Sequence, residues 1–278
     1  MVSNVTILIC GLAAFLCTVV PPVIGLVYAR KHRGEKLMIA WLLGAAGFFV
    51  TQILIRVPIL YWMQSQSWFQ TFSQNHLFLY AFSLAFTAGL FELAGRFGVA
   101  KILKNRNFHN SLATGLGHGG IEAMIIAGSS YVNNIAYSVM INAGIFDTVL
   151  GEAAAMGVDI SQLYLIRDTL LTASPALYLL GVYERVLAMT CHVAMTMVVC
   201  YSMNRGKTLQ GAFICLSIHT LLDLTAGISL LIGTALSQTT GYLIIYSILT
   251  VAAVLSMGIV GRIRKNWTET EVRHDEKV

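Results

Sequence analysis

The chain has 278 residues, of which 56% are hydrophobic and only 11% are charged. With a mean hydropathy of +0.72, this composition excludes an ordinary water-soluble domain. The net charge of +5 does not indicate a nucleic-acid partner, because the basic residues stand at the ends of apolar segments, where they reflect membrane topology. The composition therefore predicts an all-α, polytopic membrane helix bundle.

Seven apolar segments are long enough to cross a bilayer, which takes about 20 residues in a helix. They lie at 3–29, 37–62, 76–100, 111–130, 175–203, 208–233 and 241–261. The segment 131–174 is more polar, and we expect an external loop with short amphipathic helices there. Its moderately apolar part, 135–150, could instead be re-entrant, which would change the number of membrane segments by one.

Basic residues cluster after alternate apolar segments. They follow the first, third, fifth and seventh: Arg30, Lys31, Arg33, Lys36, Lys101, Lys104, Arg106, Arg205, Lys207, Arg262, Arg264 and Lys265. Cytoplasmic loops carry the excess of Lys and Arg, so the N-terminus is predicted outside and the C-terminus in the cytoplasm. We expect one transmembrane domain at 1–262 and a charged cytoplasmic tail at 263–278, in the plasma membrane.

Ionisable residues lie inside three of the apolar segments. His118 and Glu122 belong to the run Gly-His-Gly-Gly-Ile-Glu at 117–122, whereas His192 and His219 lie in later segments. An ionisable side chain in hydrocarbon costs about 2.5–3.5 kcal/mol on insertion scales, so it is rarely present without a role. A set drawn from three helices indicates a reaction centre within the bilayer.

These positions fall at a similar depth in the membrane. Glu122, His192 and His219 each lie about 11 residues from the cytoplasmic end of their helix, or about 16 Å at the α-helical rise. That is near the middle of a hydrocarbon core of about 30 Å. His118 and Glu92 would lie roughly one helical turn (about 5 Å) nearer the cytoplasm.

Spacing along each helix gives the polar residues a common face. Residues four apart lie on one helix face. Three such pairs occur, Glu92–Arg96, His118–Glu122 and His219–Asp223. The glycines at 117, 119 and 120 would let another backbone, or a substrate, approach this part of the chain closely.

Some polar residues also have plainer structural interpretations. Glu92 and Arg96 could form a structural ion pair near the inner interface. Glu184 and Arg185 are adjacent and so face different directions, and each is expected to find a partner on another helix. Arg56 is expected to extend toward the lipid headgroups.

The motif set resembles that of the YhfC family of bacterial intramembrane peptidases. The resemblance covers roughly residues 76–260 and rests on the glycine-framed run 117–123, on Glu184-Arg185 with His192, and on His219-Thr220-Leu221-Leu222-Asp223. It extends to a wider group with the type II CAAX prenyl proteases, the bacteriocin-processing proteins and PrsW.

In that wider group a glutamate motif, a lone histidine and a His-x-x-x-Asn/Asp motif form the site. The resemblance implies Glu122 as the catalytic glutamate, with His192 second and His219 and Asp223 last. The Glu-Glu-x-x-x-Arg signature of the group is absent here. The run from Glu92 to Arg96 matches half of it, which leaves open which glutamate does the chemistry.

The leading hypothesis is hydrolysis of a peptide bond in a membrane-protein or membrane-bound peptide substrate. Glu122 would act as general base, and His192 and His219 would position the water and stabilise the oxyanion. Asp223 would fix the tautomer of His219. His118 would brace the site. The supporting residues would be Glu92, Arg96, Glu184 and Arg185.

No cofactor is required in this metal-free mechanism, which we favour. A zinc-dependent mechanism is the alternative, with ligands from His118, Glu122, His192 and His219. Two further alternatives use the same polar residues. A proton-coupled transporter or channel would use them as a relay, and a non-catalytic scaffold would bind another protein through them. The expected partners are the substrate and the lipid bilayer.

The alternating basic clusters predict the outcome of topology mapping. Single cysteines placed at 30–36, 101–110 or 204–207 should react only with reagents that reach the cytoplasm, whereas cysteines within 131–174 should react from outside. Labelling of 101–110 from the outer face would contradict the orientation and the common depth that follows from it.

Overall fold

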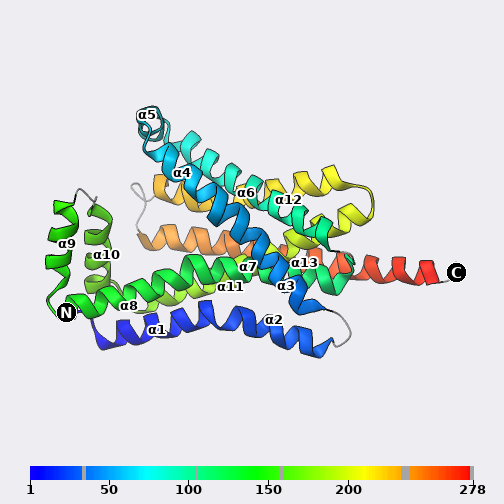
Figure 1. The fold of residues 1–278 in the computed structure, drawn as a ribbon, viewed down its shortest axis with the longest axis horizontal. Helices are drawn as coiled ribbons and strands as arrows, with labels where there is room; N and C mark the ends of the chain where they lie inside the picture. Colours follow the sequence, from blue (N-terminus) through cyan, green and yellow to red (C-terminus); the bar gives the residue numbers. More distant parts are fainter. Residues whose placement is uncertain (33–35, 104, 157–159, 233–237, 276–278) are drawn as a thin grey trace. The chain divides into compact units, whose positions relative to one another are not determined.

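A computed structural model describes residues 1–32, 36–103, 105–156, 160–232 and 238–275. These residues form helices and turns and contain no strand (Figure 1), which confirms the predicted all-α class. Arg33 and Lys104, two members of the basic clusters, lie outside the described residues.

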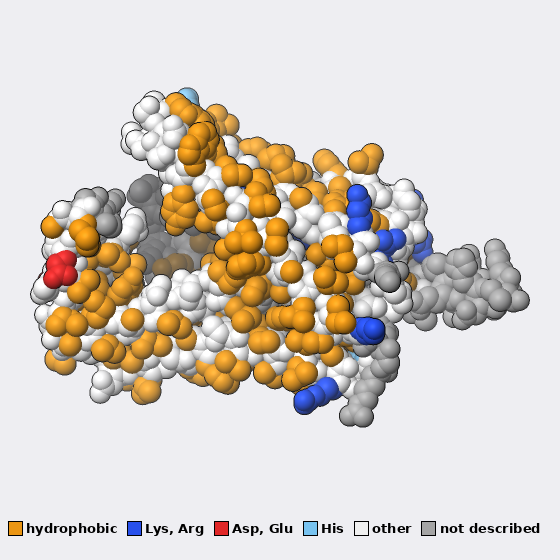
Figure 2. All heavy atoms as spheres, in the orientation of Figure 1, with side chains coloured by type: hydrophobic (Ala, Val, Ile, Leu, Met, Phe, Trp, Pro, Cys, Tyr) orange, Lys and Arg blue, Asp and Glu red, His pale blue; other side chains and the backbone are white. Residues whose placement is uncertain are grey.

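Six helices among the described residues are long and apolar enough to cross a membrane. They are Asn4–Lys31, Leu37–Gln64, Leu77–Ile102, Ala176–Asn204, Thr208–Thr225 and Thr240–Trp267. Each coincides with a predicted segment, so the chain is a polytopic membrane helix bundle. Large apolar side chains cover much of the visible surface (Figure 2), as lipid-facing helices require. The orientation stays a prediction.

The predicted span at 111–130 is not among those six. It lies in a continuous helical run made of α7 (Phe108–Glu122), the π-helix η2 (Ala123–Gly128) and α8 (Ser129–Asn142). Glycine, serine and asparagine lower the hydropathy of this run. The helix continues well beyond the predicted end at residue 130, so the segment 131–174 begins within α8. It then holds α9 (Phe146–Ala155) and α10 (Ser161–Thr172), and its external position stays a prediction.

The chain divides into two compact units, which we describe separately. The first contains Met1–Val23 and Ala123–Val186, and the second contains Ile24–Glu122 and Leu187–Val278. In the first unit, α1 (Asn4–Thr18) packs on α8 and η2. The Tyr131 hydroxyl donates to the Tyr178 carbonyl oxygen at 2.6 Å. The prediction of one domain at 1–262 stays a prediction.

The second unit begins within α2 (Val20–Lys31). Its other helices are α3 (Leu37–Phe48), η1 (Phe49–Arg56), α4 (Val57–Gln64), α5 (Ser67–Asn75), α6 (Leu77–Ile102), α7, the later part of α11 (Ala176–Asn204), α12 (Thr208–Ile232) and α13 (Gln238–Asp275). Helix α13 continues through most of the predicted tail. Helix α3 packs along α7, and α6 packs along α12.

Glycines allow these helices to touch at the backbone. A Cβ added at Gly117 would lie 1.9 Å from the Trp41 carbonyl oxygen of α3, and one added at Gly44 would lie 2.0 Å from the Thr114 carbonyl oxygen of α7. On another face of α7, Gly119 lies against Met189 and His192 of α11. Small residues bring membrane helices into close packing in this way. The close approach predicted for the glycines of α7 is confirmed at 117 and 119.

This packing makes the effect of a single methyl group predictable. Gly117→Ala should lower the free energy of unfolding by about 1–3 kcal/mol, because the new Cβ has no room and the helices must separate. The measurement is reversible unfolding of the purified protein in detergent. Gly98→Ala in α6 is the matched control, since a Cβ there has nothing within 4 Å. It should be neutral or stabilising, and equal losses in both variants would contradict the close contact.

Candidate active site

Glu92 lies in the interior of the second unit, because small residues near it on α6 let other helices pack closely. Gly95, one turn later, lies against the backbone of Gly47 on α3. Gly89, one turn earlier, lies against the His219 side chain on α12. Because α6 approaches both helices closely, Glu92 lies between them and is only 3% exposed.

One carboxylate oxygen of Glu92 is surrounded by three imidazoles. Its Oε2 accepts a hydrogen bond from His118 Nε2 at 3.0 Å. It lies 2.8 Å from His219 Nε2 and 3.5 Å from His192 Nδ1. The same oxygen accepts from Arg96 NH2 at 3.2 Å. Glu92 is therefore the centre of the polar cluster, whereas the motif pattern predicts only a supporting position for it.

Helix α7 carries His118 into this cluster. The His118 side chain is buried, and the Phe48 ring packs edge-on against it with centroids 5.4 Å apart. The imidazoles of His118 and His192 are stacked, also at 5.4 Å. Glycines beside His118 allow α11 to come this close. The predicted convergence of His118 with His192 is confirmed.

His192 is the link between the two glutamates. Its Nδ1 lies 2.6 Å from Arg96 NH2, on the side of Glu92. Its Nε2 lies 2.6 Å from Glu122 Oε2. Both ring nitrogens therefore face charged groups, and Glu122 reaches the cluster through His192.

His219 joins the cluster from α12. Its Nδ1 lies 3.3 Å from Asp223 Oδ2, one turn along the same helix. Both ring nitrogens are buried, and neither has a partner in hydrogen-bond geometry among the described residues, although the contacts to Glu92 and Asp223 are short. The Asp223 carboxylate is 41% exposed while the His219 side chain is 5% exposed, so this pair connects the cluster to its surroundings.

Arg96 places a permanent positive charge beside Glu92. Its side chain is 1% exposed. The NH2 group contacts both Glu92 and His192, while Nε and NH1 are buried and have no hydrogen-bond partner among the described residues. The ion pair that the sequence allows between Glu92 and Arg96 is present at 3.2 Å, and through His192 it is joined to the histidine cluster.

The sequence analysis missed Gln52. This residue lies in the π-helix η1 and is 5% exposed. Its Nε2 donates to Glu92 Oε1 at 2.9 Å. The signal was an amide inside the apolar segment 37–62, but a single neutral polar residue in a span carries little information.

Glu184 and Arg185 lie in the first unit and form an ion pair with each other. The partners expected for them on other helices stay a prediction. One other expectation needs correction. Arg56 does not simply extend to the headgroups. Its NH2 group donates to the Leu84 carbonyl oxygen of α6 at 2.7 Å, because a peptide carbonyl offers a partner within the protein.

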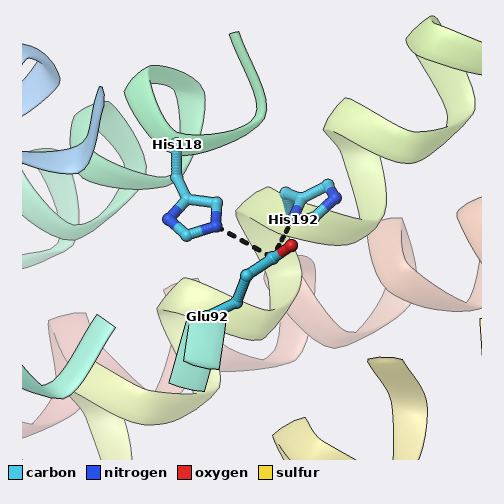
Figure 3. A group of neighbouring side chains, drawn as sticks. All are labelled: Glu92, His118 and His192. Carbon is cyan, nitrogen blue, oxygen red and sulfur yellow. Dashed lines mark hydrogen bonds and ion pairs between the residues drawn. The ribbon is translucent and has the colours of Figure 1, made fainter. Parts of the chain in front are cut away.

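The cluster contains a group of side chains that could bind a metal ion. One ligand atom each from Glu92, His118 and His192 lies within 4.8 Å of the others (Figure 3), and all three residues are buried. The predicted ligand set had Glu122 and His219 in place of Glu92. The difference follows from helix packing, because Glu122 contacts Nε2 of His192, whereas Glu92 faces Nδ1 of the same ring.

The fold and the site define a polytopic membrane protein with a buried glutamate–histidine centre that could bind a metal. The chain belongs to the YhfC intramembrane metalloprotease family, whose model matches residues 16–254. It is 27% identical over 231 residues to the uncharacterized membrane protein YhfC of Bacillus subtilis (strain 168), covering 81% of this chain and 86% of that protein. No solved structure matches.

These comparisons confirm the predicted family and the multi-pass membrane location. The family description supports peptidase activity, and its metalloprotease label gives no support to the favoured cofactor-free mechanism. The wider relation to the CAAX prenyl proteases and PrsW stays a prediction.

The buried ion pair predicts non-additive changes in stability. Glu92→Ala should lower the free energy of unfolding by about 3–5 kcal/mol, because it leaves Arg96 charged and buried. Adding Arg96→Met should recover part of that loss, since the uncompensated charge is then removed. Unfolding of both variants in detergent measures the difference. A double variant less stable than Glu92→Ala would contradict the pairing.

Proposed function

We propose that this protein is a metal-dependent peptidase that cleaves a peptide bond of a membrane-associated substrate. The observation that carries the proposal is the buried group of Glu92, His118 and His192, whose ligand atoms lie within 4.8 Å of one another. Such a group inside an apolar bundle is costly, and intramembrane ionisable residues mark functional sites. The family description supports the same activity.

The chemistry of these side chains fits zinc. Catalytic zinc sites use three protein ligands, commonly imidazole nitrogens and a carboxylate oxygen, and keep a fourth position for water or substrate. Two imidazoles and one carboxylate meet that requirement. Arg96 NH2 lies 2.6 Å from His192 Nδ1, so that nitrogen is available to a metal only if Arg96 moves aside.

Glu92, His118 and His192 would hold the ion. When bound, the metal would activate a water molecule and polarise the substrate carbonyl. Glu122, with its Oε2 2.6 Å from His192 Nε2, would orient that imidazole. Outer carboxylates commonly fix a ligating histidine in this way. This role for Glu122 differs from the general base that the sequence predicts.

His219 would handle protons at the site. It is the third imidazole at Glu92 Oε2 and does not belong to the three-residue donor group. Asp223, beside its Nδ1, would stabilise the protonated ring. His219 could then pass a proton from the attacking water to the leaving amine, as general acid–base catalysis requires. Its exposed partner gives that proton a route out of the cluster.

The same atoms also support a metal-free glutamate mechanism. The close contact of Arg96 with His192 Nδ1 favours it, because this contact fills one donor position. Glu92 would then take the proton from water, and the imidazoles around its Oε2 would position that water and stabilise the oxyanion. In both mechanisms the central carboxylate is Glu92.

Metal content and chelation distinguish the two mechanisms. The purified protein should contain about one zinc per chain, as a three-ligand catalytic site holds a single ion. Cleavage of a membrane-protein substrate should stop after chelation and return on adding zinc. His118→Ala should lose the metal, while His109→Ala, outside the cluster, should keep it. Full activity without metal would contradict the metal-dependent mechanism and leave the glutamate mechanism.

Two substitutions decide which glutamate is central. Glu92→Gln should abolish cleavage, because it removes the carboxylate that contacts three imidazoles. Glu122→Gln should lose about 10–100-fold, as expected for an outer partner of a ligand. The alternative assignment of Glu122 as general base instead predicts a loss of about 10²–10⁴-fold for Glu122→Gln.

Cleavage by both variants, each checked for folding by thermal shift, measures this difference. Near wild-type cleavage by Glu92→Gln with an inactive Glu122→Gln would contradict our proposal. Normal cleavage by both would contradict any mechanism that uses an intramembrane glutamate.

A further inference from the structure

The side-chain amide of Gln52 makes two hydrogen bonds to one turn of α6. Its Nε2 donates to Glu92 Oε1 at 2.9 Å and to the Ala88 carbonyl oxygen at 3.1 Å. An amide nitrogen carries two hydrogens, so both are used. The amide therefore fixes the carboxylate of Glu92 relative to the backbone four residues earlier.

The orientation of this amide is determined by its neighbours. The atoms near Nε2 are acceptors, so the NH2 group must face them. On the other side, Arg56 NH1 lies 3.4 Å from Gln52 Oε1, and a guanidinium only donates. If the nitrogen and oxygen of the amide were exchanged, Oε1 would face the Glu92 and Ala88 oxygens, and Nε2 would face the Arg56 guanidinium. The amide of Gln52 therefore has one stable orientation.

Arg56 contacts both the side-chain amide of Gln52 and the backbone of α6. Its guanidinium donates to the Leu84 carbonyl oxygen at 2.7 Å and lies 3.3 Å from the Thr87 hydroxyl. Arg56 and Gln52 thus contact successive turns of α6 that lead to Glu92. This series of contacts holds η1 and α6 in one alignment at the level of the site.

Gln52 lies in a π-helix, η1. Segments of π-helix are rare and are frequently found at functional sites. Here η1 spans Phe49–Arg56 and contains both Gln52 and Arg56. The other π-helix, η2, begins at Ala123, directly after Glu122. Both segments therefore border residues of the cluster.

We infer that Gln52 is a positioning residue for Glu92. By holding Oε1, it directs Oε2 toward His118, His192 and His219 and prevents the carboxylate from rotating. The inference rests on Glu92 being the central carboxylate of the proposed function. It adds a residue that acts through Glu92 and does not itself contact the reacting atoms.

Histidine NMR tests the inference without requiring activity. In protein labelled with ¹⁵N-histidine, the imidazole resonances of His118 and His219 report their contacts with Glu92. Gln52→Met keeps the length of the side chain and removes the donor, so these two sets of resonances should shift. The rings of His32 and His109 pack on each other, with centroids 4.4 Å apart, and belong to no contact with Glu92 given above. Their chemical shifts should therefore not change, which makes them an internal control.

A neighbouring substitution controls for general disturbance of η1. Thr51→Val keeps shape and removes a hydroxyl that donates to the Gly47 carbonyl oxygen within the same helix, so the His118 and His219 resonances should not move. Gln52→Asn retains an amide that is too short to reach, and should reproduce the shift if Gln52→Met does not fold. Resonances of His118 and His219 unchanged in a folded Gln52 variant would overturn the inference.

Kinetics provide a second measurement. Gln52→Met should lower kcat by about 10–100-fold with KM nearly unchanged, since outer-sphere partners of a metal ligand act at this scale. A rise in KM with unchanged kcat would overturn the positioning role. If the wild-type protein neither binds zinc nor cleaves, the proposed function fails, but the histidine resonances still decide whether Gln52 orients Glu92.

Discussion

The carboxylate of Glu92 must find all its stabilisation inside the protein. It is 3% exposed, and a buried charge is tolerated only when it is paired and hydrogen-bonded. Arg96, Gln52 and His118 donate to it at 2.9–3.2 Å. Since Gln52 comes from η1 and His118 from α7, these hydrogen bonds hold α6 against both elements.

Close packing of small residues makes that arrangement possible. Gly95 lies against the backbone of Gly47 and Gly117 against the backbone of α3, while Gly89 lies against side chains of α12. Apolar association is weak between helices in lipid, so such contacts and interhelical hydrogen bonds provide specificity. The glycines and the polar cluster therefore depend on each other, because wider helix spacing would leave Glu92 without partners.

The helices and the identity of most cluster residues could be predicted from the sequence. Hydropathy predicted seven membrane segments, of which six coincide with long apolar helices among the described residues, and intramembrane histidines stand out because they are costly. The central role of Glu92 could not be found, because Arg96 four residues later offers a complete local partner. Gln52 could not be found because a single neutral amide in an apolar segment carries little information. Hydropathy reports neither the rotation nor the spacing of the helices, and these decide which polar side chains contact Glu92.

The charges around His192 are compatible with the proposed hydrolysis. Glu92 and Glu122 bring two carboxylates near His192, and Arg96 supplies one permanent positive charge. In a low-dielectric interior the remaining negative charge calls for a proton on an imidazole or for a bound cation. In the proposed function, either one would supply positive potential where a tetrahedral oxyanion forms, and preorganised charge of this kind lowers the barrier to acyl transfer. The buried negative charge of Glu92 would therefore serve the proposed hydrolysis, because it requires the positive group that the oxyanion needs.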